Sequence, residues 1–354
     1  MQMLELSRGL HEIGLHVSLA VASERRWESK ARETGCALQT FSRRSLLKLA
    51  MITAVRSIIR RERIEIIHAH HGRDYWPAVI AAKLAGNGCR VVVTRHLMTR
   101  PRRVSRALLL RFSHLIAVSA AVAAVQRTEL RGPQERVHLA HGNVDTDRFT
   151  PGRCDAANEF RKQQGWSEET VAFGVVGAFD LPRGKGQAEF IEAAAVLARR
   201  FPQARFAIIG SGTMEPLLRQ SIRVRGLEKI VAMVPFTDDI VPVMRGLDVL
   251  VHPAVGTEAL GVVLWEAMAC GKPVIASRLH GIPEAFIEGE HGRLVPPGEV
   301  SALADAMEEL LANPALRLRW GEAGRTHVCR NFSRCAHAKR VAAIYRKILA
   351  DRTS

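Results

Sequence analysis

Two glutamates eight residues apart, Glu258 and Glu266, flank a glycine that can open a helix. The chain leaves a loop at Gly261 and continues from Val262 as an apolar, helix-forming run. A helix N-terminus presents unpaired backbone N–H groups and a positive dipole end, which suit a diphosphate. One carboxylate then lies ahead of the phosphates and the other one to two turns behind them. Carboxylates accept hydrogen bonds from hydroxyl pairs, and a nucleotide sugar carries hydroxyls on both sides of its diphosphate.

A glycine-rich loop after an apolar strand supplies candidate cations. It runs from Gly177 through Arg183 and Lys185 to Gly186. Glycines let the backbone approach a ligand closely, and the two cations can neutralise a diphosphate. The loop is not a Walker motif, because Gly186 and Gln187 follow the lysine. The alternative is that Lys185 is an ordinary solvated lysine.

Histidines gather at the ends of two apolar strands in the N-terminal half. His68 and His70 share one side of their strand by the period of two, and His96 ends another strand. The carboxyl ends of parallel strands line the ligand crevice of doubly wound sheets. These side chains are therefore candidates for a functional site, the alternative being hydrogen-bonded structural histidines. No carboxylate or cysteine pattern completes a metal site around them, so we expect no metal.

Three segments carry a resemblance to glycosyltransferase family 4, the retaining nucleotide-sugar glycosyltransferases. They are residues 257–276 with the Glu-x7-Glu pair, residues 174–186 with Lys185, and residues 280–284, His-Gly-Ile-Pro-Glu. The resemblance implies the GT-B architecture, in which two doubly wound Rossmann-like domains face a cleft. It also implies transfer of a sugar from a nucleotide-diphosphate sugar, with no metal or other cofactor.

The resemblance assigns roles to individual positions. It implies that Glu258 holds the sugar hydroxyls, that Glu266 holds the ribose, and that Lys185 and Arg183 stabilise the leaving diphosphate. Arg183 is a substitute, because Ala178 stands where the family often has arginine. The remaining assignments are backbone contacts from Gly177, Gly261, Val262 and Gly281 to phosphate, from the loop at Phe236 to the base, and His96 near donor sugar and acceptor.

Strand-like and helix-like segments alternate along the whole chain, which predicts two parallel α/β sheets. The expected strands are residues 16–21, 64–70, 90–94, 115–119, 137–140, 171–177, 205–210, 230–234, 248–252 and 273–277. Turn residues at 150–153 predict the domain break. We therefore expect an N-terminal acceptor-binding domain at 1–150 and a donor-binding domain at 151–332. By the resemblance, a final helix at 333–354 crosses back to the first domain.

The N-terminus departs from the family pattern. Residues 1–14 read as a helix, whereas a Rossmann-type domain begins with a strand and a glycine-rich turn. We expect that first strand to be missing, through a truncated or misassigned start or as a natural variant. The missing turn would approach the donor phosphates and the acceptor, so activity of the chain depends on this point.

Composition places the chain among globular proteins with reduced thiols. Six cysteines form no Cys-x2-Cys pair, no apolar run is long enough for a transmembrane helix, and the first residues are not a signal peptide. We therefore expect a cytoplasmic protein. Residues 1–150 hold 25 Lys and Arg against 12 Asp and Glu, a net charge of +13, and residues 151–354 hold 26 against 23, a net of +3. The basic half predicts an anionic partner.

Two basic segments carry most of that excess charge. Residues 43–63 read as a basic amphipathic helix, which either packs on the core with a solvated basic face or docks on an anionic membrane surface. The second interpretation predicts peripheral association with the inner face of the membrane. Six arginines between Arg95 and Arg111 make a second patch that suits an anionic or lipid-phosphate acceptor. Aromatic residues are scarce in both, so we expect no nucleic-acid partner.

We therefore predict a retaining glycosyltransferase acting on a carbohydrate or glycolipid acceptor. Alternatives remain open: a sugar-nucleotide epimerase of the same fold, a phosphorylase, or a catalytically impaired module that binds nucleotide sugars or membranes. A phosphorylase of this fold would need a pyridoxal lysine, and no lysine in the sequence is singled out for that role.

Overall fold

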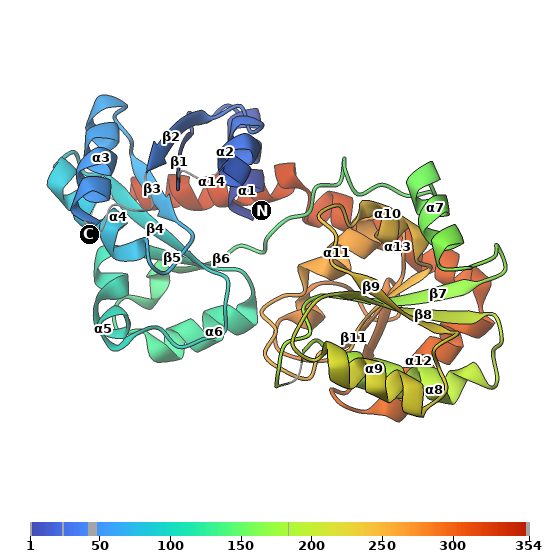
Figure 1. The fold of residues 1–354 in the computed structure, drawn as a ribbon. Coiled ribbons are helices and arrows are strands. Elements are labelled where there is room, and N and C mark those ends of the chain that lie inside the picture. Colours follow the sequence, from blue (N-terminus) through green and yellow to red (C-terminus); the bar gives the residue numbers. More distant parts are fainter. Residues whose placement is uncertain (1, 23–24, 42–47, 183, 352–354) are drawn as a thin grey trace. The chain divides into compact units, whose positions relative to one another are not determined.

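The computed structural model describes residues 2–22, 25–41, 48–182 and 184–351, and these divide into two compact units (Figure 1). Unit 1 consists of Met1–Asn143 and Phe332–Ser354, and unit 2 consists of Val144–Asn331. Unit 2 is thus inserted into the sequence of unit 1.

Unit 1 alternates helices and strands. Its helices are α1 (Gln2–Glu12), α2 (Arg25–Arg32), α3 (Lys48–Arg61), α4 (Tyr75–Ala85), α5 (Arg103–Phe112), α6 (Ala120–Glu129), the 3₁₀ helix η1 (Gln134–Arg136) and α14 (Arg334–Ala350). Its strands are β1 (Ser18–Ala22), β2 (Ala37–Phe41), β3 (Ile66–Ala69), β4 (Arg90–Arg95), β5 (His114–Ala117) and β6 (Val137–Leu139).

The strands of unit 1 form two separate parallel sheets. Strands β3, β4, β5 and β6 pair in that order, and β1 pairs with β2. Within the described residues, no strand joins β1 to β3. Helix α1 bridges the two sheets through its apolar side chains, because Leu4 packs with the β1 residues Leu19 and Val21 while Leu6 and Leu10 belong to the core around β4 and β5.

Helix α14 packs on α1, although more than 300 residues separate them in sequence (Figure 1). The buried Arg334 guanidinium donates from Nε to Glu5 at 2.8 Å and from Nη1 to Glu12 at 3.1 Å. A Cβ on Gly9 would lie 3.0 Å from the Cβ of Ala338, so only glycine allows the two helices this close an approach. The last helix therefore completes the core of unit 1.

Unit 2 has the same alternation. Its helices are α7 (Asp155–Gln163), α8 (Gln187–Ala198), α9 (Glu215–Val224), α10 (Val241–Gly246), α11 (Val262–Ala269), η2 (Ile282–Glu284), α12 (Val300–Ala312) and α13 (Pro314–Asn331). Its strands are β7 (Val171–Val176), β8 (Ala204–Gly210), β9 (Val231–Pro235), β10 (Val249–His252), β11 (Val274–Ser277) and β12 (Gly292–Val295).

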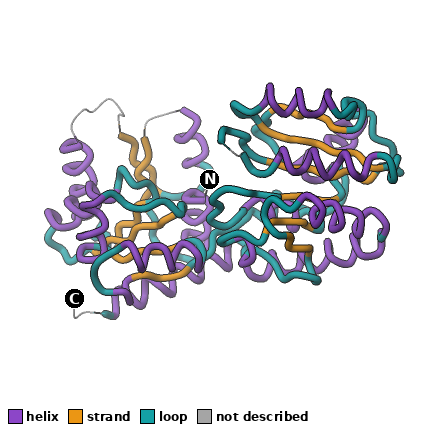
Figure 2. Tube along the Cα trace, turned by 90° about the horizontal axis from the view of Figure 1, so that it is seen from below, coloured by secondary structure: helices purple, strands orange, loops and turns teal. Residues whose placement is uncertain are grey.

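These six strands form one parallel sheet in the order β12-β11-β10-β7-β8-β9, with helices on both sides of the strands (Figure 2). The sheet core is apolar on both faces, as a parallel sheet covered by helices requires. The register aligns Leu250 with Gly174 and His252 with Ala276, so β7, β10 and β11 end at one edge. This carboxyl edge carries the loops that hold the candidate site residues.

The prediction of two Rossmann-like parallel α/β sheets is confirmed, and each expected strand overlaps an observed one. The break between the units lies at Asn143, earlier than the expected 150/151, and the return to unit 1 lies at Phe332. Residues 144–149 pack with unit 2 because Arg325 donates to the carbonyls of Thr146 and Phe149, at 3.0 and 2.6 Å. That side chain comes from α13, far along the sequence, so the turn residues at 150–153 alone could not locate the break.

The basic segment expected at 43–63 forms α3, and residues 42–47 lie outside the described residues. Ile52 and Ile59 are buried, and α3 packs along α4. The Nε atoms of Arg56 and Arg60 donate to the carbonyls of Leu84 and Ala85 at the end of α4. The described part of this helix is therefore a packed element of unit 1.

Among the helices of the described residues, none combines the length and the apolar character that a bilayer crossing needs.

Candidate active site

The carboxyl edge of the unit 2 sheet brings together a lysine and a glutamate from two loops. The Nζ of Lys185 lies 2.6 Å from Oε2 of Glu258, across 73 residues of sequence. The Nε2 of the buried His252, the last residue of β10, lies 3.5 Å from the same oxygen. A cation, a carboxylate and an imidazole thus meet where β7 and β10 end.

Glycines in left-handed conformations shape the loop that carries Lys185. A Cβ on Gly177, at φ +146°, would lie 3.2 Å from Cγ of Lys185, and a Cβ on Gly186, at φ +86°, would lie 1.9 Å from the carbonyl oxygen of Pro253. A side chain at Gly177 would crowd Lys185 within the same loop, and one at Gly186 would push that loop away from Pro253. The Oε1 of the buried Gln187 accepts from the backbone N–H of Lys185 at 2.7 Å and fixes the lysine backbone.

Glu258 is held as a carboxylate. Burial alone would raise its pKa, but the contacts with His252 and Lys185 outweigh burial and lower the pKa to about 2. An ionised carboxylate accepts hydrogen bonds and donates none, so it suits the hydroxyls of a sugar.

Helix α11 begins beside this cluster. Its N-cap is Gly261 at φ +77°, a Cβ on which would lie 3.7 Å from Cδ2 of His252. The first intrahelical bond runs from the N–H of Leu264 to the carbonyl of Gly261, and the N–H groups of Val262 and Val263 precede it. These amides make an anion-binding end next to the Lys185–Glu258 pair.

Glu266 lies on the same helix, five residues after Gly261 or about 7.5 Å along the axis. Burial raises its pKa to about 7, against the opposing effect of Arg148. Its side chain forms no hydrogen bond or ion pair with the described residues, so its oxygens remain available as acceptors for a ligand.

The other expected contact residues of unit 2 also lie at this edge. Gly281 precedes η2, and its N–H lies 3.5 Å from the carbonyl oxygen of Glu258. Phe236 follows β9 directly and is exposed. Gly177 follows β7 directly and donates to the carbonyl of Ile209 at 3.0 Å. Arg183 lies outside the described residues.

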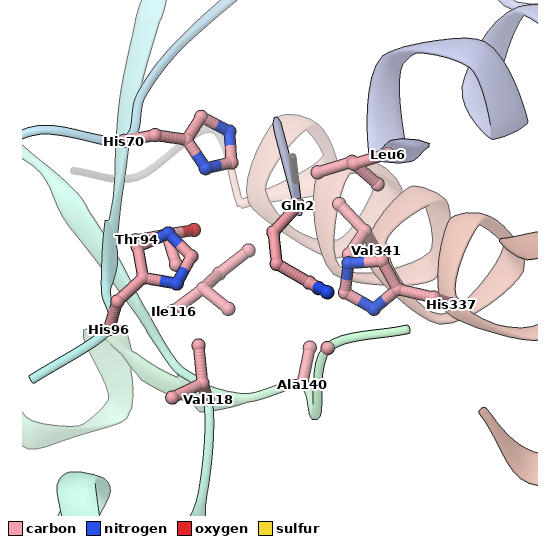
Figure 3. A pocket seen from close by; sticks show the side chains of 11 residues that line it. Gln2, Leu6, His70, Thr94, His96, Ile116, Val118, Ala140, His337 and Val341 are labelled. Carbon is pink, nitrogen blue, oxygen red and sulfur yellow. The ribbon is translucent and has the colours of Figure 1, made fainter. Parts of the chain in front are cut away.

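In unit 1, His96 lies at a small histidine-lined cavity at the end of β4. The side chains of His70, His96 and His337 surround it together with Gln2 (Figure 3). The rings of His70 and His96 stack with centroids 5.8 Å apart, and those of His68 and His70 stack at 4.2 Å. The cavity has a volume of about 10 Å³, which is enough for one water molecule.

These histidines are neutral. Burial lowers the pKa of His96 and of His337 to about 4, and it also lowers the pKa of His70. His68 is held from both ring nitrogens, because Nδ1 bonds the hydroxyl of Tyr345 and Nε2 bonds that of Thr94, each at 2.6 Å. Among the described residues, no group of three or more His, Cys, Asp or Glu side chains is arranged to hold a metal ion.

Comparison with known proteins gives matches over both units. The family described as Glycosyltransferase Family 4 matches residues 1–148, and the one described as Glycosyl transferases group 1 matches residues 156–327. A mannosyltransferase of Mycolicibacterium smegmatis, GDP-mannose-dependent alpha-(1-6)-phosphatidylinositol monomannoside mannosyltransferase, is 31% identical over 292 residues, 79% of this chain and 69% of that protein. The chain belongs to glycosyltransferase family 4.

Another relative and a solved structure extend the comparison. Alpha-D-kanosaminyltransferase of Streptomyces kanamyceticus is 33% identical over 245 residues, 66% of this family 4 chain and 62% of that protein, so the chain spans less than two thirds of it. The crystal structure of Anabaena Alr3699/HepE in complex with UDP matches with a TM-score of 0.82 at 20% identity, over 98% of this chain and 95% of that one. This likeness shows that the two proteins share a fold.

Some residues of this candidate site were not found from the sequence. His252 ends a strand, and the rule that selected His96 would also have selected His252. Gln187 and Arg148 carry no such signal, because the hydrogen bond of Gln187 to the Lys185 backbone and the electrostatic effect of Arg148 on Glu266 depend on how loops and helices pack. The contribution of α14 to the histidine cavity depends on the return of the chain to unit 1.

Proposed function

We propose that this chain is a retaining, metal-independent glycosyltransferase that moves a sugar from a nucleotide-diphosphate sugar to a carbohydrate or glycolipid acceptor. The observation that carries the proposal is the ionised Lys185–Glu258 pair beside the first amides of α11, with Glu266 behind them on that helix. This order of carboxylate, anion site and carboxylate matches the order of sugar, diphosphate and ribose.

The proposed roles follow from that order. Glu258 accepts hydrogen bonds from the sugar hydroxyls, and Glu266 accepts them from the ribose. Lys185, Arg183 and the amides at Gly261 and Val262 stabilise the negative charge that develops on the departing diphosphate. The acceptor attacks from the same face, and the leaving phosphate takes its proton. Around this centre, Gly177 and Gly281 let the phosphates approach the backbone closely, although their own N–H groups donate to the carbonyls of Ile209 and Glu258. Phe236 lies at the base, and the neutral His96 of unit 1 serves donor sugar and acceptor.

Two comparisons support the donor and acceptor classes. The Anabaena structure holds UDP, and the Mycolicibacterium relative is named for a GDP-mannose donor and a phosphatidylinositol monomannoside acceptor. We infer a nucleotide-sugar donor of the same chemical class and a lipid-linked saccharide as acceptor.

The donor site is tested by thermal stability of the purified chain with UDP, GDP, ADP and CMP, with and without attached sugars. A nucleotide that binds only the folded state adds about 2.7 kcal/mol at 100 times its Kd. We expect one nucleotide to raise the Tm and Glu266→Ala to remove that shift. No shift with any nucleotide would contradict the proposed donor site.

The chemistry is tested by sugar transfer once the nucleotide is known. Lys185→Ala should lower turnover by about a hundredfold or more, because it removes a cation from the departing diphosphate. Lys162→Ala, at an exposed lysine of α7, is the matched control. The product should keep the anomeric configuration of the donor by NMR, and EDTA should leave the rate unchanged. Near-normal turnover of Lys185→Ala would exclude the assigned role.

A further inference from the structure

His252 is a buried imidazole whose hydrogen-bonding capacity is unused. The residue ends β10 and is 3% exposed, and its backbone is held in the sheet beside Ala276 of β11. Neither of its ring nitrogens forms a hydrogen bond with the described residues. Buried polar side chains rarely lack a partner, so an exception of this kind calls for an explanation.

His291 of unit 2 is buried to a similar extent but is satisfied. It is 4% exposed, and its Nδ1 accepts from the backbone N–H of Ile287 at 3.1 Å. Its ring lies against that of His327, with centroids 4.4 Å apart. These contacts give His291 a structural role. Burial alone therefore does not leave a histidine of this unit without a partner.

The ring of His252 lies close to Glu258 without bonding it. Its Nε2 is 3.5 Å from Oε2 of Glu258, whereas an ordinary N–H···O bond measures about 2.9 Å. The same oxygen is bonded at 2.6 Å to Nζ of Lys185. A Cβ on Gly261 would lie 3.7 Å from Cδ2 of the imidazole, so the start of α11 packs against the ring and restricts its movement.

The pair of Lys185 and Glu258 joins two groups that the proposed function assigns to different parts of the donor. A lysine whose charge is balanced by a carboxylate attracts a diphosphate less than a free one does. The pair must therefore open when the donor binds. The Glu258 side chain is 15% exposed, and a carboxylate this buried needs a hydrogen-bond donor to stay ionised. Opening the pair would remove its nearest donor.

We propose that His252 is a positioning residue that takes the place of Lys185 at Glu258 when the nucleotide sugar binds. Lys185 moves to the diphosphate, Nε2 of His252 donates to Oε2 of Glu258, and Oε1 is left for the sugar hydroxyls. The inference rests on the proposed function, because it keeps the roles given there to Lys185 and Glu258. It adds a closed resting pair and a third group that holds the carboxylate when that pair opens.

An imidazole at the end of a strand suits this role. Closing the contact from 3.5 Å to an ordinary hydrogen bond needs a shift of about 0.6 Å. A neutral imidazole supplies one N–H donor and no charge, so it holds Glu258 without competing with Lys185 for the diphosphate. The strand backbone keeps the ring in place while the loop that carries Lys185 adjusts to the ligand.

The experiment compares two amides at position 252 by calorimetric titration of the full chain. The titrant is the sugar derivative of UDP, GDP, ADP or CMP that stabilises the wild type most. The amide nitrogen of glutamine reaches about as far as Nε2, and that of asparagine only as far as Nδ1. We expect His252→Asn to lower the affinity about tenfold or more, because a hydrogen bond to a charged group is lost. His252→Gln should retain most of the affinity, and His291→Asn should bind like the wild type.

A double-mutant cycle separates this role from a purely structural one. Glu258→Gln removes the carboxylate that His252 is proposed to hold. Adding His252→Asn to that variant should therefore lower the affinity by less than about twofold further. A structural role for His252 would instead produce the same loss in both backgrounds.

Three results would overturn the inference: wild-type affinity in His252→Asn, equal losses in His252→Asn and His252→Gln, or an undiminished loss in the Glu258→Gln background. Each leaves the proposed function in place, because the wild type still binds the nucleotide sugar. A wild type that binds none would overturn both proposals. Thermal unfolding checks that each variant is folded, and His252→Leu, which fills the same space without a donor, replaces His252→Asn if the latter unfolds.

Discussion

At the scale of single residues, the carboxyl group of Glu266 lies in a buried environment that disfavours its ionised form. Burial raises its pKa to about 7 from an ordinary 4.5. An unfolded chain releases this proton near pH 4.5, and the folded chain releases it near pH 7. Between these values the native state binds more protons, so the contribution of Glu266 to the free energy of unfolding falls as pH rises.

Glu266→Gln should remove that pH dependence. The variant should gain roughly 2 to 3 kcal/mol of stability relative to the wild type when the pH changes from about 4.5 to about 8, because the amide carries no buried charge. Urea unfolding of both proteins across this range measures the difference. Glu215→Gln, at an exposed pair of α9, is the control, and parallel pH profiles for wild type and Glu266→Gln would refute the prediction.

His280 adopts a backbone conformation that is uncommon for a residue other than glycine. It has φ +45°, and among the described residues Arg63, at φ +52°, is the other non-glycine with positive φ. His280→Gly and Arg63→Gly should each stabilise the chain by about 1 kcal/mol, because glycine adopts this region without strain.

The two substitutions should differ in function. His280 precedes Gly281, whose N–H lies against the Glu258 carbonyl, so His280→Gly should also change the preference among nucleotide sugars. Arg63→Gly, in unit 1, should leave that preference intact. Chemical unfolding gives the stability, and thermal shifts with a panel of nucleotide sugars give the preference. If His280→Gly left the preference among nucleotide sugars unchanged, the strained backbone of His280 would have a role in the turn only.

The sequence singles out residues whose signal is local. His96 and the Glu258 and Glu266 pair were selected because strand ends and helix starts lie where the hydrophobic pattern changes, and their roles stay predictions. The ion pair between Lys185 and Glu258 joins loops 73 residues apart, and no spacing rule encodes that distance. The burial that raises the pKa of Glu266 is likewise a product of packing.

At the scale of elements, the conformation of the loop between β7 and α8 depends on the close approach of Gly186 to Pro253. Alanine at 186 combines a strained φ with a methyl group 1.9 Å from a carbonyl oxygen. At Gly226, with φ +65°, an added methyl group would meet open space, so alanine there isolates the effect of φ.

We therefore expect Gly226→Ala to cost about 1 kcal/mol and Gly186→Ala to cost about 2 kcal/mol or more beyond that. Gly186→Ala should also weaken nucleotide binding, because its methyl moves Lys185 away from Glu258. Urea unfolding and nucleotide thermal shifts measure both effects. Equal stability losses in the two variants would mean that the contact with Pro253 relaxes freely.

The types of the elements were predicted well, but the sequence did not predict which of their faces are exposed. The alternation of apolar strands and helical periods reflects local physics, which is why each expected strand overlaps an observed one. Amphipathicity alone marked the basic helix at 43–63 for membrane contact, and the structure shows that Ile52 and Ile59 of this helix are buried whereas Leu49 is exposed. Only the packed structure shows which apolar face is already covered.

At the scale of the whole molecule, unit 2 is a continuous segment with its own six-stranded sheet and core, and unit 1 needs segments from both sides of it. A fragment of residues 144–331 should fold alone with a cooperative thermal transition. A fragment of residues 1–143 should not, because α1 and β4 lose the α14 residues Val341, Ala342 and Tyr345 from their core. Circular dichroism and calorimetry of the two fragments test this, and a cooperative transition in 1–143 would contradict it.

The position of α14 also sets an order of events during synthesis. A ribosome that has produced α1 to β6 must still translate residues 144–331 before it makes α14, the helix that covers the core of unit 1. At about 5 to 20 residues per second this takes about 10 to 40 s. During that time Leu6 and Leu10 of the nascent unit 1 are not yet covered by α14, whereas unit 2 can already fold. The first half of the chain is thus the part that a chaperone would have longest to bind.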